Sequence, residues 1–356
     1  MTLKNLFLWI IGLAVITAAV FILGLEEIAA SIKQIDPGMF GFLLLLQIFT
    51  LLAAALQWQF LLKKLNQKLS LGLVMAVTLA GNYIESVTPA VKLGGEAAKV
   101  YLFRKHSSLD YDRLAGILLA LKYYSMLPFV CLAMVFSGSA FLNFNLPRPA
   151  LGAFVFLLIF FAALVFLYHR AGSKAGSNSA PDSSRPVPGR ALNEAGHNRS
   201  RTIFINGLVS IKSRLDKITT FVNRAALLSR SMTNRQEALA LIALSKLVWL
   251  AYPFKVYLVA RMLGLETGLI TIAVITFTAY LVSMVPLLPG GLGSFEATMA
   301  LMFSLNGFSP AEGLTVALVT RLVTYWFPLL LSALAAAYLA LIGTPGLKGE
   351  PGRVPG

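Results

Sequence analysis

The sequence is poor in charge and in cysteine. Only 13% of its 356 residues are charged and 57% are hydrophobic, whereas a soluble domain is about one-quarter charged and about half apolar. This balance excludes an ordinary water-soluble enzyme and a chain that is disordered throughout. The single cysteine, Cys131, has no partner for a disulfide, which excludes a secreted disulfide scaffold. An all-α polytopic membrane protein remains.

The sequence also lacks the motifs of common catalytic and cofactor sites. It has no Gly-x-x-x-x-Gly-Lys-Ser/Thr loop for a nucleotide, no Gly-x-Ser-x-Gly elbow and no His-Glu-x-x-His site. Its three histidines, at positions 106, 169 and 197, do not have the spacing of metal ligands. We therefore predict no catalytic residue, no metal and no cofactor.

Long apolar runs are abundant instead. Six of them are long enough to cross a hydrocarbon core, which needs about 20 helical residues: 4–25, 39–62, 114–136, 150–169, 239–263 and 313–341. Two shorter stretches, 71–88 and 269–285, are each followed by a Pro/Gly break and a short helical piece, 94–105 or 293–306. Because a helix of about 16 residues reaches only about 24 Å, each pair is predicted to be a re-entrant hairpin.

Most of the net charge of +15 lies in one loop. Residues 170–235 hold twelve Lys/Arg and three Asp/Glu, a net charge of +9. A basic loop between apolar spans favours the cytoplasmic face of a membrane, and residues 171–200 have no aromatic ring to stack on a base, so no nucleic acid is expected as a partner. We predict a partly disordered cytoplasmic loop at 170–238, a disordered tail at 343–356, and cytoplasmic N- and C-termini.

An internal repeat relates the membrane halves 1–169 and 239–342. The pattern Tyr-x-x-Ser-x-x-Pro, then Gly-Gly and Glu-Ala, begins at Tyr83 and again at Tyr280. Downstream, Asp112, Lys122, Tyr124 and Pro128 correspond to Glu312, Arg321, Tyr325 and Pro328. Counting the spans between them predicts inverted units, about 39–136 and 239–341, with hairpins that enter from opposite faces. Chance similarity between Leu/Ala-rich helices is the alternative.

Glycines and charges gather at both hairpin turns, and we select them as candidate substrate-binding residues. Glycines allow close approach of a headgroup, and lysines at a helix N-terminus suit a phosphate. The first set is Lys92, Gly94, Gly95, Glu96 and Lys99; the second is Pro289, Gly290, Gly291, Gly293, Ser294 and Glu296, with Ser294 as the expected N-cap. An amphipathic helix lying on the membrane surface is the alternative for the first set.

A carboxylate in an apolar stretch needs a partner. For Glu296 we predict Arg321, the only basic residue between positions 261 and 348. Lys122 holds the matching position in the first unit and is expected to face Glu96 or Glu85, another candidate site residue. Such pairs can also serve only to fix the hairpins to the bundle.

Three more residues lie near these charges. Tyr124 and Tyr325 follow the basic residues and are candidates for lining a headgroup cavity, although packing is the more common role of such rings. Lys255 lies within the span 239–263, and we expect its side chain to extend outward to water.

The residues just described resemble a known family. Pro289-Gly-Gly-Leu-Gly-x-x-Glu296, Arg321 with Tyr325-Trp326-x-Pro328, and Thr88-Pro89…Gly94-Gly95-Glu96-Ala97…Lys99 are similar to the flippase-like transmembrane domain of lysylphosphatidylglycerol synthases, over roughly 5–169 and 239–342. The family usually has an arginine where this chain has Lys99. In two-part members this domain is implicated in moving aminoacylated phosphatidylglycerol between leaflets, and a separate C-terminal part transfers the amino acid. The few residues after 342 cannot form that part, so the resemblance implies no synthase activity.

The leading hypothesis is a translocator of a polar or aminoacylated phospholipid in the cytoplasmic membrane, working downhill or coupled to an ion. Its expected partners are membrane lipids, an anionic or aminoacylated phospholipid above all; a lipid-modifying enzyme and an oligomer are further options. One alternative is a membrane-embedded transferase that acts on a lipid-linked substrate with Glu96 or Glu296 as base. The other is a non-catalytic scaffold that recruits a synthase through the basic loop.

Overall fold

The computed structural model describes residues 35–87, 93–143, 231–284 and 289–342, with isolated positions between 155 and 229. These ranges are helical and contain no strand. The predicted span 4–25, most of the loop 170–238 and the tail 343–356 lie outside the described residues, and so does the span 150–169 except for three helical positions.

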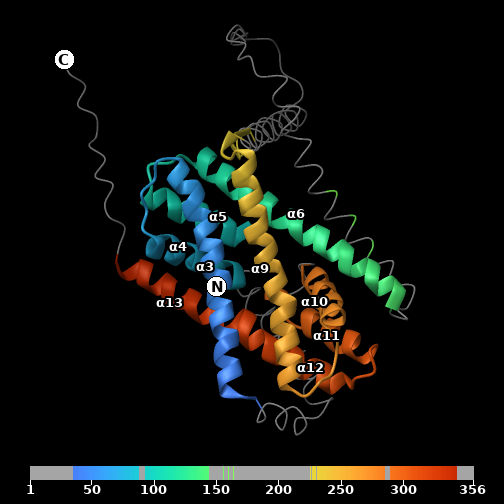
Figure 1. The fold of residues 1–356 in the computed structure, drawn as a ribbon. Helices are drawn as coiled ribbons and strands as arrows, with labels where there is room; N and C mark the ends of the chain where they lie inside the picture. Colours follow the sequence, from blue (N-terminus) through green and yellow to red (C-terminus); the bar gives the residue numbers. More distant parts are fainter. Residues whose placement is uncertain are drawn as a thin grey trace, which may run out of the picture.

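Two long helices, α3 (Pro37–Lys64) and α9 (Arg235–Met262), run antiparallel through the molecule (Figure 1). Three contacts between them set the directions: Lys64 pairs with Glu237, Gln57 donates to Ser245, and Lys255 donates to Gln47. Each helix has 28 residues, about 42 Å at 1.5 Å per residue. Both are therefore long enough to cross a membrane.

Both helices begin a few residues before the predicted spans 39–62 and 239–263, because capping residues precede the apolar runs. Asp36 accepts a hydrogen bond from the backbone N–H of Met39 at 2.6 Å, ahead of Pro37. Asn234 and Glu237 form a capping box at the start of α9. Such side chains satisfy N–H groups that have no partner in the first helical turn.

The two short helical pairs start at opposite ends of the molecule. α4 (Leu71–Val87) packs against α5 (Leu93–His106), and α10 (Leu269–Ser283) packs against α11 (Ser294–Ser304). α4 follows the C-terminal end of α3 and α10 follows the C-terminal end of α9. Because α3 and α9 are antiparallel, α4 and α5 lie toward the upper end of the molecule in Figure 1, and α10 and α11 toward the lower end.

The last span of each half reaches the other half. α6 (Tyr111–Asn143) packs on α5 and also on α10. The final span consists of α12 (Pro310–Arg321), a π-helical turn (Leu322–Trp326) and α13 (Phe327–Leu341), and α13 packs along α4. The π-turn lies just before Pro328, which has no N–H to donate to an α-helical ladder. This reciprocal packing joins the two halves.

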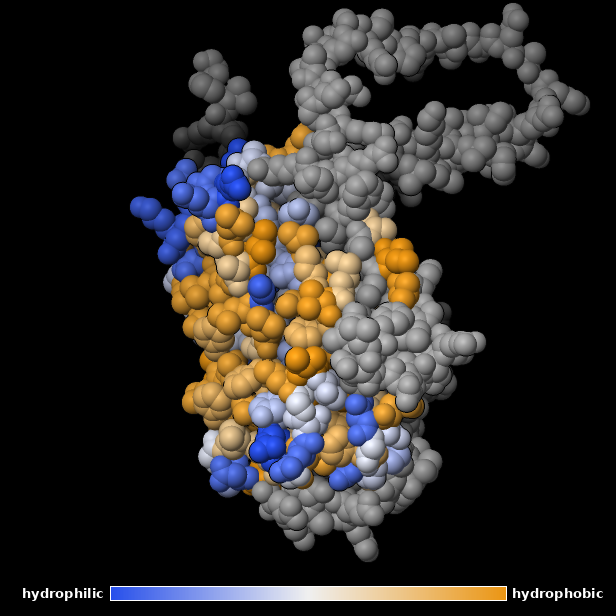
Figure 2. Space-filling model, turned by 45° about the vertical axis from the view of Figure 1, so that its right-hand side comes forward, coloured by the Kyte–Doolittle hydropathy of each residue, from blue (hydrophilic) through white to orange (hydrophobic). Residues whose placement is uncertain are grey.

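The surface is that of a membrane protein. Among the described residues, four segments are long and apolar enough to cross a membrane: α3, residues 111–136 of α6, α9, and residues 310–341. Their outward apolar side chains include Leu45, Val135 and Leu334, which are 65%, 68% and 59% exposed. Figure 2 shows a broad apolar band with hydrophilic side chains gathered at its two ends. Four of the six predicted spans are thus present, and the chain is a multi-pass helical membrane protein.

Candidate functional site

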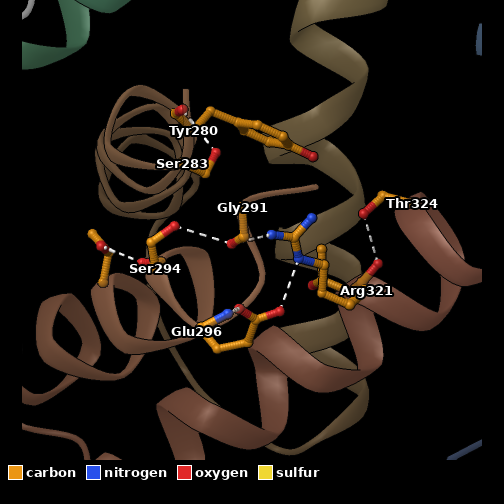
Figure 3. A network of polar contacts seen from close by, with 10 residues as sticks. Tyr280, Ser283, Gly291, Ser294, Glu296, Arg321 and Thr324 are labelled. Carbon is orange, nitrogen blue, oxygen red and sulfur yellow. Dashed lines mark hydrogen bonds and ion pairs between the residues drawn. The ribbon is translucent and has the colours of Figure 1, made fainter. Parts of the chain in front are cut away.

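The second hairpin holds a buried ion pair close to its turn. Arg321 Nε donates to Glu296 Oε1 at 2.9 Å, and Arg321 Nη2 donates to the carbonyl oxygen of Gly291 at 2.9 Å (Figure 3). The two side chains are only 8% and 3% exposed. The guanidinium also lies 4.3 Å from the ring centre of Phe295 and 5.2 Å from that of Tyr325. The predicted Glu296–Arg321 pair is present, and it attaches the final span to the hairpin.

The turn of this hairpin requires glycine. Gly290, Gly291 and Gly293 have φ angles of 62°, 66° and 80°, a region that residues with a Cβ rarely adopt. A Cβ on Gly290 would also overlap the ring of Tyr325. Pro289 begins this turn, so the predicted second set of residues is arranged around one tight bend.

The prediction that Ser294 caps α11 is wrong. The N-cap is Gly293, because its positive φ turns the chain one residue earlier, and Ser294 is already the first helical residue. Glu296 Oε2 accepts a hydrogen bond from Gly293 N at 2.7 Å, and the Ser294 hydroxyl donates to Gly291 O at 3.0 Å. Glu296 therefore has two tasks: it completes the cap and it binds Arg321.

The first hairpin holds a looser network from three helices. Glu96 on α5 lies 3.2 Å from Lys99 Nζ and 2.5 Å from Lys122 Nζ on α6, and Lys99 Nζ lies 4.0 Å from Glu85 on α4. The side chains of Glu96 and Lys99 are 9% and 10% exposed, but that of Lys122 is 45% exposed. The predicted pairing of Lys122 with Glu96 is present, and Lys122 is the most exposed member of the network.

Close contact between α4 and α5 brings these charges together. A Cβ on Gly95 would lie 2.7 Å from the carbonyl oxygen of Gly81 and 3.0 Å from Glu85 Cα, closer than a methyl group tolerates. Gly94 lies half-buried beside it in the first turn of α5. Lys92, the remaining candidate of this set, lies outside the described residues.

The two hairpins meet within the bundle. α4, which carries Glu85, contacts the Pro289–Gly291 turn of the second hairpin and packs along α13. The same Pro289–Gly291 turn also contacts Arg321 and Tyr325 of the final span. The two charged networks therefore lie on either side of one shared contact between the hairpins.

The tyrosines differ from each other. Tyr124 is 7% exposed within the apolar core, and its hydroxyl shares a 2.5 Å hydrogen bond with that of Thr233. Tyr325 covers Gly290, and its buried hydroxyl has no hydrogen-bond partner within the described residues. A buried hydroxyl without a partner is uncommon in folded proteins.

Lys255 differs most from its prediction. Its side chain does not extend outward; the residue is 1% exposed and its ammonium donates to Gln47 and Thr50 of α3. Sequence reasoning missed this contact because its partners are apolar-helix residues far away along the chain. No group of three or more His, Cys, Asp or Glu that could hold a metal occurs in the part of the chain that the structure describes.

Known proteins are similar in sequence to nearly the whole chain. The family described as the lysylphosphatidylglycerol synthase TM region matches residues 9–332, which include both hairpins. The chain belongs to this family. A UPF0104 membrane protein of Methanothermobacter thermautotrophicus is 25% identical to this family member over 344 residues, 96% of both chains. Another from Pyrococcus horikoshii is 22% identical over 336 residues, 93% of this chain and 96% of the relative.

A third relative of this family member, a UPF0104 membrane protein of Methanocaldococcus jannaschii, is 21% identical over 341 residues, 93% of this chain and 94% of the relative. The names of these archaeal proteins state that they are membrane proteins and state no activity. The predicted resemblance to the synthase transmembrane region is therefore confirmed.

Proposed function

We propose that this family member is a lipid translocator of the cytoplasmic membrane, which moves a polar or aminoacylated phospholipid between leaflets. The observation that carries the proposal is the meeting of two hairpins that start at opposite ends of the α3–α9 pair, each with its own charged network. In this proposal the halves are inverted repeats, both hairpins are re-entrant, and the chain termini are cytoplasmic.

A headgroup needs polar partners on its way through hydrocarbon, because an unpaired charge there costs several kcal/mol. The network of the first hairpin offers both signs of charge: Glu96 suits the ammonium of an aminoacyl group, and Lys99 and Lys122 suit the phosphate. Since Lys122 is the exposed member, we propose that the headgroup first binds here. The closed Glu296–Arg321 pair then forms the far wall of the pathway.

The test is a transport assay in vesicles. Purified protein is reconstituted with reporter lipids that a membrane-impermeant quencher reaches in the outer leaflet only. We expect the wild type to make inner-leaflet lipid reachable, and Glu96→Gln to slow this about tenfold, which corresponds to about 1.4 kcal/mol in the barrier. Lys63→Gln, at the exposed end of α3, is the control and should transport normally. A wild type no faster than protein-free vesicles would refute the proposal.

Lipid analysis of a deletion strain distinguishes a translocator from a transferase. A translocator leaves the set of lipids unchanged and alters their distribution between leaflets. Loss of one lipid species, measured by mass spectrometry, would instead indicate an enzyme, with Glu96 or Glu296 as its base.

A further inference from the structure

Lys255 is a buried cation on the transmembrane helix α9. It lies seven residues from the C-terminal end of the helix, about 10 Å at 1.5 Å per residue. Its Nζ is 2.5 Å from Gln47 Oε1 and 3.4 Å from Thr50 Oγ1, and 4.5 Å from the ring centre of Tyr252. Gln47 and Thr50 are themselves 2% and 3% exposed. All of the contacts that hold this ammonium group are therefore neutral.

Among the described residues, none of the ion pairs includes Lys255. The buried charged side chains in the described part of 239–342 are Lys255, Glu296 and Arg321. Glu296 is already bound to Arg321. The described part of this half thus has two buried cations for one buried carboxylate, and an intramembrane charge that no described carboxylate neutralises indicates a functional site.

Aromatic side chains connect this lysine to the ion pair of the second hairpin. The ring of Tyr252 lies 5.0 Å from that of Tyr280, and Tyr280 lies 5.2 Å from Phe295. Phe295 is the ring that faces Arg321, at 4.3 Å. α9 also packs directly against α10 and α12. Lys255 therefore belongs to the same interior as the second hairpin and lies on its α3 side.

We propose that Lys255, Gln47 and Thr50 form a second site for the phosphate of the transported lipid, besides Lys99 and Lys122 of the first hairpin. This rests on the function proposed above. An amide and a hydroxyl each both accept and donate hydrogen bonds. They hold the ammonium when the site is closed, and they turn to donate to phosphate oxygens, beside the ammonium, when α3 and α9 separate for the lipid.

The test measures binding in detergent, where transport plays no part. Native mass spectrometry of the full chain compares phosphatidylglycerol with diacylglycerol of the same acyl chains. We expect the wild type to prefer phosphatidylglycerol about tenfold, and Lys255→Met to reduce that preference several-fold, because Lys99 and Lys122 of the first hairpin remain. Lys246→Met, an exposed lysine of the same helix, is the matched control and keeps it. A Lys255→Met variant with the preference of the wild type would overturn the proposal.

A second variant leaves the lysine in place. Gln47→Glu has the same shape and supplies a counter-ion within the protein, so it is expected to raise the unfolding temperature and to reduce the preference for phosphatidylglycerol as much as Lys255→Met does. A raised unfolding temperature with an unchanged preference would mean that Lys255 only joins two helices, and would overturn the proposal.

Further outcomes distinguish lipid phosphate from free phosphate as the ligand, and the translocator hypothesis from the Lys255 site. Excess inorganic phosphate should not displace phosphatidylglycerol; displacement would assign the site to free phosphate and overturn the lipid assignment. Preferential binding by a wild type that moves no lipid in vesicles would refute the translocator and keep phosphate recognition at Lys255. Transport by a wild type without any preference would refute phosphate recognition at Lys255 and keep the translocator.

Discussion

The two hairpins carry similar charges but hold them differently. In the second, the planar guanidinium of Arg321 binds both a carboxylate and a backbone carbonyl, and nine-tenths or more of each side chain is buried. In the first, two ammonium groups share Glu96, and Lys122 is 45% exposed. A guanidinium has five donors in a fixed plane, whereas an ammonium on a flexible stem acts as a point charge. The second network is therefore the more rigid of the two, and our proposal assigns binding of the headgroup to the first.

The largest expected effect is on stability, at Arg321. Arg321→Gln leaves Glu296 buried without a counter-ion, so the free energy of unfolding should fall by about 3–5 kcal/mol. Chemical denaturation in detergent measures this. The double variant Glu296→Gln/Arg321→Gln removes both charges and should recover part of the loss. If the double variant is less stable than the single one, the second network does not act as an ion pair.

The turn of the second hairpin should be nearly as sensitive. Gly290→Ala combines a positive φ with overlap of the Tyr325 ring, and we expect a loss of about 1–3 kcal/mol. Gly307→Ala is the control, since Gly307 also has a positive φ but no atom within 4 Å of its missing Cβ. Equal losses at the two positions would show that backbone strain alone matters and that packing against Tyr325 does not.

Lys122 should give the opposite result to Arg321. Since its side chain is 45% exposed and Glu96 keeps Lys99 as a partner, Lys122→Gln should change the free energy of unfolding by less than about 1 kcal/mol. Lipid transport in vesicles should nevertheless fall about tenfold. Lys246→Gln provides an exposed reference lysine. Normal transport by Lys122→Gln would contradict the division of tasks between the two hairpins.

The smallest effect is expected where α3 ends. Lys64 pairs with Glu237 at the solvent-exposed rim, and such pairs contribute little because water and salt screen them. Lys64→Gln should leave both the unfolding temperature and lipid transport at wild-type values. A clear loss of transport with this variant would mean that the headgroup also contacts the rim.

Much of this site could be predicted from the order of residues. Pro/Gly breaks after short apolar helices indicate the hairpins, and a lone Glu296 in an apolar stretch leaves Arg321 as its partner. The contact of Lys255 with Gln47 spans 208 residues, and nothing along the chain distinguishes Gln47 from other polar residues of apolar helices. The N-cap at Gly293 depends on the positive φ angle of that residue, which the turn sets. The residue types alone do not predict this angle.

The π-helical turn has a consequence for the direction of Arg321. Arg321 precedes Pro328 by seven residues, whereas Lys122 precedes Pro128 by six, and a π-turn accommodates one residue more than an α-turn. Each residue of an α-helix corresponds to about 100° of rotation. Deletion of one residue between Leu322 and Trp326 would convert the π-turn to an α-turn and keep both Arg321 and Glu296. The Arg321 side chain would then be rotated about the helix axis by about 100°, away from the Glu296 carboxylate.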